Sequence, residues 1–97
     1  MSEMEVLQDG RVRYTRDGKL HREDGPAKIH PDGTQEWFLE GERHRADGPA
    51  VTKPSGYKAW YKNGVRHRDD GPAVERLDTS QWWLEWWIDG VRQLDHV

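Results

Sequence analysis

The chain has 97 residues, of which fifteen are Lys or Arg, eighteen are Asp or Glu and none is Cys, so its formal net charge is -3. This length fits one small domain, the near balance of charge argues against a nucleic-acid partner, and the lack of cysteine excludes disulfides, thiolate metal sites and cysteine nucleophiles. The sequence shows no apolar run near the roughly 18 residues of a membrane helix and no secretory signal, so we expect a cytoplasmic protein without a membrane contact.

One sequence motif occurs three times at a spacing of 23 residues. The motif His-Arg-x-Asp-Gly-Pro-Ala begins at His21, His44 and His67. An aromatic residue, followed four positions later by Gly, precedes each copy and occurs once more after a three-residue insertion; these residues are Tyr14, Trp37, Trp60 and Trp86. This periodicity predicts a single repeat domain over residues 1–97. We expect a partial first unit, repeats at about 11–33, 34–56 and 57–82, and a degenerate unit at 83–97.

Each unit is predicted to form a β-hairpin. The residues before each turn alternate in the manner of a strand, with side chains on one face at positions 12, 14, 16, then 35, 37, 39, then 58, 60, 62, and finally 84, 86, 88. The turn pairs are Asp17-Gly18, Glu40-Gly41, Asn63-Gly64 and Asp89-Gly90, which suit type I′ geometry, although Glu is a poorer choice than Asn or Asp. The Gly-Pro step of the motif should break or bulge the returning strand.

We therefore expect an all-β fold: an elongated antiparallel meander of stacked 23-residue hairpins. The four periodic aromatic residues should form a ladder on one face, each ring covered by side chains of its neighbours. A short helix beginning near 79–81 is the alternative for the tryptophan-rich segment, but the repeat register favours a strand there. The differing first and last units fit a stacked array, whose ends must stay soluble.

The repeated residues resemble the MORN-variant β-hairpin repeats, the group that includes YwqK-type antitoxin components. The pattern that carries the resemblance is aromatic-x-x-Asn/Asp-Gly-x-x-His-Arg-x-Asp-Gly-Pro-Ala, and it spans roughly residues 8–93. The His-Arg-x-Asp-Gly-Pro-Ala form is similar to repeats of phage and large-virus proteins. The resemblance implies a stacked hairpin scaffold that serves as an interaction surface. In place of the usual MORN glycines and aromatics this chain has His-Arg-x-Asp, so a lipid-binding role does not carry over.

The repeated His and Asp residues are interpreted as structural. Asp can accept backbone N–H bonds in a turn, and His can bridge to that carboxylate or to a carbonyl; the residues are His21, Asp24, His44, Asp47, His67 and Asp70. A metal site or acid-base catalysis is the alternative. Stacked hairpins would lie roughly 10 Å apart, which separates neighbouring histidines too far to share one ion. We predict no catalytic residue, no metal and no cofactor.

Two sets of residues are candidates for partner binding. Arg22, Arg45 and Arg68 recur beside the histidines and could bind anions or stack on aromatic rings, with pairing to nearby carboxylates as the alternative. The second set is Trp82, Trp83, Trp86 and Trp87, in a strand that places Trp83 and Trp87 opposite the other two. Four indoles represent about 800 Å² of surface, more than a soluble monomer usually exposes. A terminal cap packed on the third unit is the alternative.

The leading hypothesis is a non-enzymatic protein-interaction module, concretely a small phage-type stoichiometric inhibitor of a host or defence protein, acting in the host cytoplasm. The partner would be a host protein, a defence protein or a toxin, and a homodimer through the tryptophan-rich hairpin is a further alternative. A sponge for nucleotides or other small anions, using Arg and Trp, is the second hypothesis. An antitoxin-like binder is the third.

Overall fold

The fold consists of short β-strands joined by turns. The computed structural model describes residues 3–78 and 80–93, which form strands and no helix. The strands are β1 (Glu3–Val6), β2 (Val12–Arg16), β3 (Lys19–Leu20), β4 (Lys28–Ile29), β5 (Gln35–Glu36), β6 (Phe38–Leu39), β7 (Glu42–Arg43), β8 (Val51–Thr52), β9 (Lys58–Ala59), β10 (Tyr61–Lys62), β11 (Val65–Arg66), β12 (Val74–Asp78), β13 (Gln81–Ile88) and β14 (Val91–Gln93). The all-β prediction is confirmed, and the helical alternative for the tryptophan segment is wrong; Thr79 lies outside the described residues.

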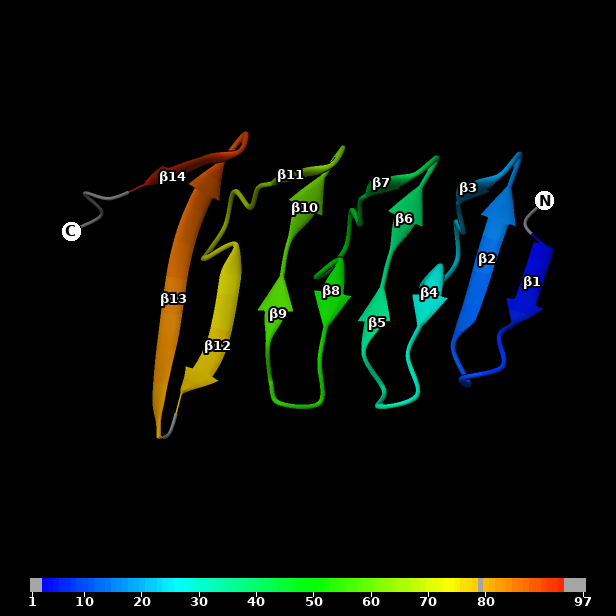
Figure 1. Cartoon of the computed structure of the whole chain (residues 1–97). Helices are drawn as coiled ribbons and strands as arrows, with labels where there is room; N and C mark the ends of the chain where they lie inside the picture. The colour runs from blue at the N-terminus through cyan, green and yellow to red at the C-terminus, as the bar shows by residue number, and fades with distance from the viewer. Residues whose placement is uncertain (1–2, 79, 94–97) are drawn as a thin grey trace.

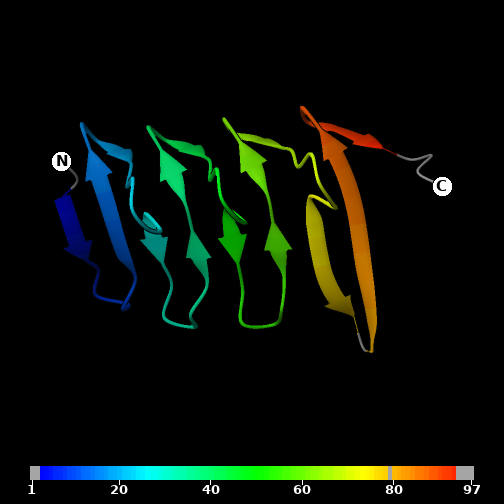
Figure 2. The ribbon, with the colours of Figure 1, turned by 180° about the vertical axis from the view of Figure 1, so that it is seen from behind.

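Ten strands form one antiparallel sheet that follows the chain. Its order is β1-β2-β4-β5-β8-β9-β12-β13-β14, with β3 beside β2, and the pairs β6-β7 and β10-β11 form two small separate sheets. Successive hairpins lie side by side, with their tips bent along one edge (Figure 1), and the view from behind shows the same row (Figure 2). The molecule is a slab of 44 × 29 × 17 Å. The prediction of an elongated hairpin-connected meander is confirmed.

The turns at the hairpin tips have type I′ geometry. Asp17, Glu40, Asn63 and Asp89 have φ between 48° and 52°, and the glycine after each has φ between 79° and 87°. Both central residues of a type I′ turn need positive φ, and this requirement is strained for any side chain other than Asn or Asp. The predicted turns are confirmed, including the one at Glu40 where the residue type suits the geometry least.

The turns at the opposite ends of the hairpins are longer. At the second hairpin the His30 N–H donates to the Thr34 carbonyl at 2.9 Å, and Gly33 N–H donates to the His30 carbonyl at 3.0 Å. Asp32 Oδ1 accepts the Thr34 N–H at 2.8 Å. Gly33 has a φ of 94°, as expected for the glycine that closes a three-residue hairpin loop.

The alanine that ends each motif lies at a bulge. Ala27 N–H donates to the Glu36 carbonyl, and the next residue, Lys28, also pairs with Glu36, so two residues oppose one. The same arrangement places Ala50 and Val51 opposite Ala59. The bulge expected from the Gly-Pro step is therefore present, and it returns the chain from the looped motif to the sheet.

The core is thin because a single sheet exposes both faces. Its fully buried members are small: Ala27, Ala50, Ala59 and Ala73 are 0% exposed, Val74 is 3% and Val51 is 7%. Tyr57, Tyr61 and Trp87 pack against the cluster of Val51, Ala59 and Val74. The large aromatic residues therefore lie over the sheet rather than inside it.

Candidate functional site

Each arginine of the motif lies flat on the aromatic ring of its own hairpin. The guanidinium carbons of Arg22, Arg45 and Arg68 lie 4.0, 3.9 and 3.9 Å from the ring centroids of Tyr14, Trp37 and Trp60. These distances are within the range of cation–π contacts. The strand register places the three rings and Trp86 on one face of the sheet, as predicted. The ring contact comes from the hairpin's own looped motif, whereas we expected neighbouring side chains to supply it.

The donors of these arginines are bonded within the motif. Arg45 Nε donates to Asp47 Oδ1 at 3.1 Å, and its Nη1 donates to the Pro49 carbonyl at 3.2 Å. The same two bonds occur at the other two copies. A Cβ atom at Gly48 would lie 3.0 Å from the Arg45 guanidinium carbon, so the glycine makes room for the arginine. The Arg-x-Asp-Gly-Pro segment is therefore a clip that holds one arginine over one ring.

Each histidine of the motif joins its hairpin to the next one along the chain. Nδ1 of His21, His44 and His67 accepts the backbone N–H of Glu40, Asn63 and Asp89 at 2.9, 3.0 and 2.9 Å. Two backbone bonds accompany the contact at the first junction: Arg22 N–H donates to the Phe38 carbonyl, and Gly41 N–H donates to the Leu20 carbonyl. His21 is 4% exposed. The histidines therefore fasten consecutive hairpin tips, a contact that the sequence analysis did not identify.

The aspartates of the motif differ from the expectation of an Asx-type turn. Asp24, Asp47 and Asp70 accept from guanidinium groups, as described above, and their side chains are between 83% and 89% exposed. At the third copy His67 Nε2 lies 2.9 Å from Asp69 Oδ1, and Asp69 directly precedes the motif aspartate Asp70. Within residues 3–78 and 80–93, no group of three His, Cys, Asp or Glu side chains could hold a metal ion.

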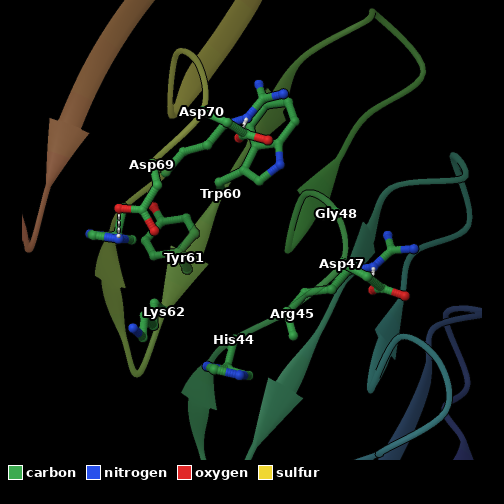
Figure 3. Close-up of a pocket in the computed structure, with 12 residues that line it drawn as sticks. His44, Arg45, Asp47, Gly48, Trp60, Tyr61, Lys62, Asp69 and Asp70 are labelled. Carbon is green, nitrogen blue, oxygen red and sulfur yellow. Dashed lines mark hydrogen bonds and ion pairs between the residues drawn. The ribbon is translucent and has the colours of Figure 1, made fainter.

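A groove of about 760 Å³ lies between the second and third copies of the motif. Figure 3 shows Arg45, Asp47 and Gly48 on one side, with Trp60, Asp69 and Asp70 on the other. Its charged lining consists of three cationic and three anionic side chains: Arg45, Lys62, Arg68, Asp47, Asp69 and Asp70. Because both arginines already bond to aspartates, the groove offers an anionic ligand little uncompensated positive charge.

The face of the sheet opposite the Tyr14, Trp37 and Trp60 rings carries a buried carboxylate, Glu36, in a hydrogen-bond network. Glu36 is 8% exposed, and it bonds to His30 Nε2 at 2.7 Å and Arg43 Nη2 at 2.8 Å. Burial raises the pKa of Glu36, but the hydrogen bonds from His30 and Arg43 outweigh it and leave the pKa below its ordinary value of 4.5. This network connects the loop at residues 31–33 of the second hairpin to β7 at the tip of the same hairpin.

The same face carries a row in which aromatic rings alternate with arginines. The Arg43 guanidinium carbon lies 5.4 Å from the Phe38 centroid and 5.6 Å from that of Tyr61. Arg66 interacts with the Tyr61 side chain and lies 5.0 Å from the Trp87 ring. The row therefore runs from the second hairpin into the C-terminal one, and it was not predicted because its members come from positions outside the repeated motif.

The tryptophans of the C-terminal hairpin are not equally accessible. Trp82 is 56% exposed and Trp83 44%, beside Leu84 at 42% and Leu77 at 44%. Trp86 and Trp87 are half-buried, and Trp87 packs on the core cluster. The alternative of a cap packed on the third unit therefore fits Trp86 and Trp87, in the second half of β13. The first half of β13 presents the indoles of Trp82 and Trp83 to solvent.

Glu85 fixes the orientation of two of these indoles. Its Oε2 accepts the Trp83 Nε1–H at 2.8 Å, and its Oε1 accepts the Trp87 Nε1–H at 3.0 Å. Partial burial raises the pKa of Glu85, but the two indole bonds outweigh this effect and lower the pKa overall. Arg76 lies 5.2 Å from the Trp83 centroid on the same face. Trp83 and Trp87 therefore share a face, as predicted, and Trp83 is held in place while exposed.

Comparison with known proteins gives no family for this chain. No family model matches it, and the searches of curated proteins and of solved structures return no match. The described part of the chain contains no helix that is long and apolar enough to span a membrane.

Proposed function

We propose that the chain is a non-enzymatic protein-interaction module built as a stack of MORN-like 23-residue hairpins. The proposal is supported by contacts that recur at the sequence spacing: the arginine on its ring, the arginine–aspartate pair and the histidine bond to the next tip. Because these polar groups are engaged within the chain, they serve the scaffold. Catalysis would instead need a poised acid, base or nucleophile.

The observation that carries the proposal is the exposure of Trp82 and Trp83 at one end of the sheet. Tryptophan is the residue type most enriched at binding hot spots, and Trp83 is held in one orientation by Glu85, so little conformational entropy would be lost on binding. The binding surface of the module is therefore the outer part of the C-terminal hairpin, with Leu77, Trp82 and Leu84 on one face of the sheet and Trp83 on the other.

The partner's identity rests on the resemblance drawn from the motif. A small stoichiometric inhibitor of a host or defence protein, or an antitoxin-like binder, is the concrete form we propose. A nucleotide or anion sponge is less well supported, because Arg22, Arg45 and Arg68 already donate to carboxylate and carbonyl oxygens. Partner binding by these three arginines stays a prediction.

The test is affinity capture from cell extract with matched surface variants. The double variant Trp82→Ser/Trp83→Ser should lose a near-equimolar bound protein, with affinity reduced about thirtyfold or more, as for a hot-spot loss of 2 kcal/mol. The control is Met4→Ser/Val6→Ser, because Met4 and Val6 are 60% and 62% exposed at the opposite edge of the sheet. Capture that is equal in both variants, with circular dichroism unchanged, would contradict the proposal.

A further inference from the structure

The outer edge of β13 is the edge that faces away from β12, and it is open at residues 81–85. One edge of β13 pairs with β12 throughout residues 81–85, whereas β14 pairs with the other edge at residues 86–88. Among the described residues, no strand pairs with the outer edge of residues 81–85. This edge lies at one end of the sheet (Figure 1) and is flanked by the exposed Trp82, Trp83 and Leu84. An open, apolar edge is a template for another strand.

The backbone groups that point outward can be assigned from the rest of the sheet. In β5, Gln35 pairs with Thr52 of the next hairpin, and Trp37 N–H donates to the Ala50 carbonyl. Gln35 corresponds to Leu84 in the fourth copy. Because backbone direction alternates along a strand, the N–H and C=O groups of Trp82 and Leu84 point outward, and those of Trp83 point toward β12.

We propose that two copies of the chain pair through this edge, with β13 antiparallel to β13 of the second copy. This inference rests on the proposed function and names a second copy as a partner of the same surface. The antiparallel register that uses all of residues 81–85 in both copies places Trp83 opposite its own symmetry mate. It also places Trp82 opposite Leu84 of the second copy, and these outward-facing residues form the hydrogen-bonded pairs.

Side-chain chemistry favours this register. Gln81 falls opposite Glu85 of the second copy, so its amide can donate to a carboxylate that already accepts the Trp83 and Trp87 indoles. The two Trp83 residues form a non-hydrogen-bonded pair, in which side chains approach most closely and aromatic pairs are stabilising. No like charges face one another within residues 81–85.

The other end of the sheet is unsuited to the same edge. β1 occupies the position in the first hairpin that β4, β8 and β12 occupy later, so head-to-tail stacking would place Glu5 of one copy opposite Glu85 of another. Like charges directly opposite are destabilising. Met4 would also fall in the position of Ala27, Ala50 and Ala73, which are 0% exposed in the sheet. Pairing of β13 with itself therefore closes a twofold dimer, and an open fibre is disfavoured.

The test is sedimentation equilibrium of the full chain across a wide concentration range. A five-residue edge is small, so we expect a dimer with a dissociation constant on the order of 10 µM. Gln81→Lys should tighten the dimer about three- to tenfold, because Lys faces Glu85, and Gln81→Glu should weaken it by a similar factor. Leu84→Pro removes an outward N–H and should abolish the dimer while circular dichroism stays the same.

A monomer at every concentration, or a dimer indifferent to Gln81 and Leu84, would overturn the inference. Glu5→Gln should leave the dissociation constant unchanged; tighter association in this variant would indicate head-to-tail pairing instead. A monomeric chain that still captures a protein through Trp82 and Trp83 would refute self-pairing and leave the proposed function standing. A β13 dimer without such capture would support self-pairing and count against the proposed function.

Discussion

His44 and Asn63 lie 19 positions apart in the sequence, and Nδ1 of the histidine accepts the backbone N–H of the asparagine at 3.0 Å. The bond joins the motif of one hairpin to the tip of the next, and the same bond occurs at His21 and His67. In a sheet with so thin a core, such contacts hold the hairpins together beyond the strand ladder itself. The motif histidine therefore acts between hairpins, whereas the motif arginine acts within one.

The histidine contact can be tested by changing its acceptor. His21→Leu should lower the free energy of unfolding by about 1–3 kcal/mol, because the Glu40 N–H loses its acceptor in a partly buried place. His21→Asn retains an acceptor near the Nδ1 position and should recover part of the loss. His44→Leu should cost less, because its bond to Asn63 is exposed. Urea denaturation measures all three; equal stability of His21→Leu and His21→Asn would contradict the role.

The arginine clip predicts a coupling between Arg45 and Gly48. Gly48→Ala should destabilise the chain by about 1–2 kcal/mol, because a Cβ 3.0 Å from the Arg45 guanidinium carbon displaces it from the Trp37 ring. In an Arg45→Ala background the same glycine change should cost much less. A double-mutant cycle of unfolding free energies checks this coupling. Additive losses would show that Gly48 does not serve the arginine.

Glu36 predicts loss of stability in acid. Its folded-state pKa lies below the ordinary value of 4.5, so its contribution is fully present above that value and is lost as the pH falls through the folded-state pKa. Glu36→Gln should therefore show a smaller decline in stability from pH 5 toward pH 2 than the unaltered chain. Glu3→Gln serves as a control, because the Glu3 carboxylate is exposed. The measurement is the urea midpoint at each pH, and parallel declines in all three proteins would refute the assignment.

The turn at Glu40 predicts a stabilising substitution. Glu40 has a φ of 49°, and Asn63 has a φ of 50° at the corresponding position of the next hairpin. Asn tolerates this conformation better, so Glu40→Asn should raise the melting temperature by an amount equivalent to about 0.5 kcal/mol, after loss of the exposed ion pair with Arg16. Asn63→Glu is the reciprocal variant and should lower it. Changes of the same sign in both variants would contradict the strain argument.

The sequence by itself determined the strands, the turns and the face shared by the periodic aromatic residues. These features depend on local chemistry: alternation of side chains, Asn-Gly and Asp-Gly pairs that accept positive φ, and a Gly-Pro step that interrupts pairing. This information lies within a few residues of each element, and it could be recognised because the motif occurs three times in the sequence. The excess of indoles also indicated an uncovered aromatic surface on the C-terminal strand, with Trp83 and Trp87 on the face that lacked a cover. The structure instead exposes Trp82 and Trp83 and packs Trp87 on the core cluster.

The tertiary structure decided which groups meet across hairpins. That His21 bonds to the Glu40 backbone, that Arg43 lies between Phe38 and Tyr61, and that Glu85 holds two indoles depend on the bend of the tips and on the spacing between strands. It also decided which tryptophans are covered, since burial depends on the packing of neighbouring strands rather than on residue type. Contacts between distant residues carry no local signature, and only the folded sheet brings them together.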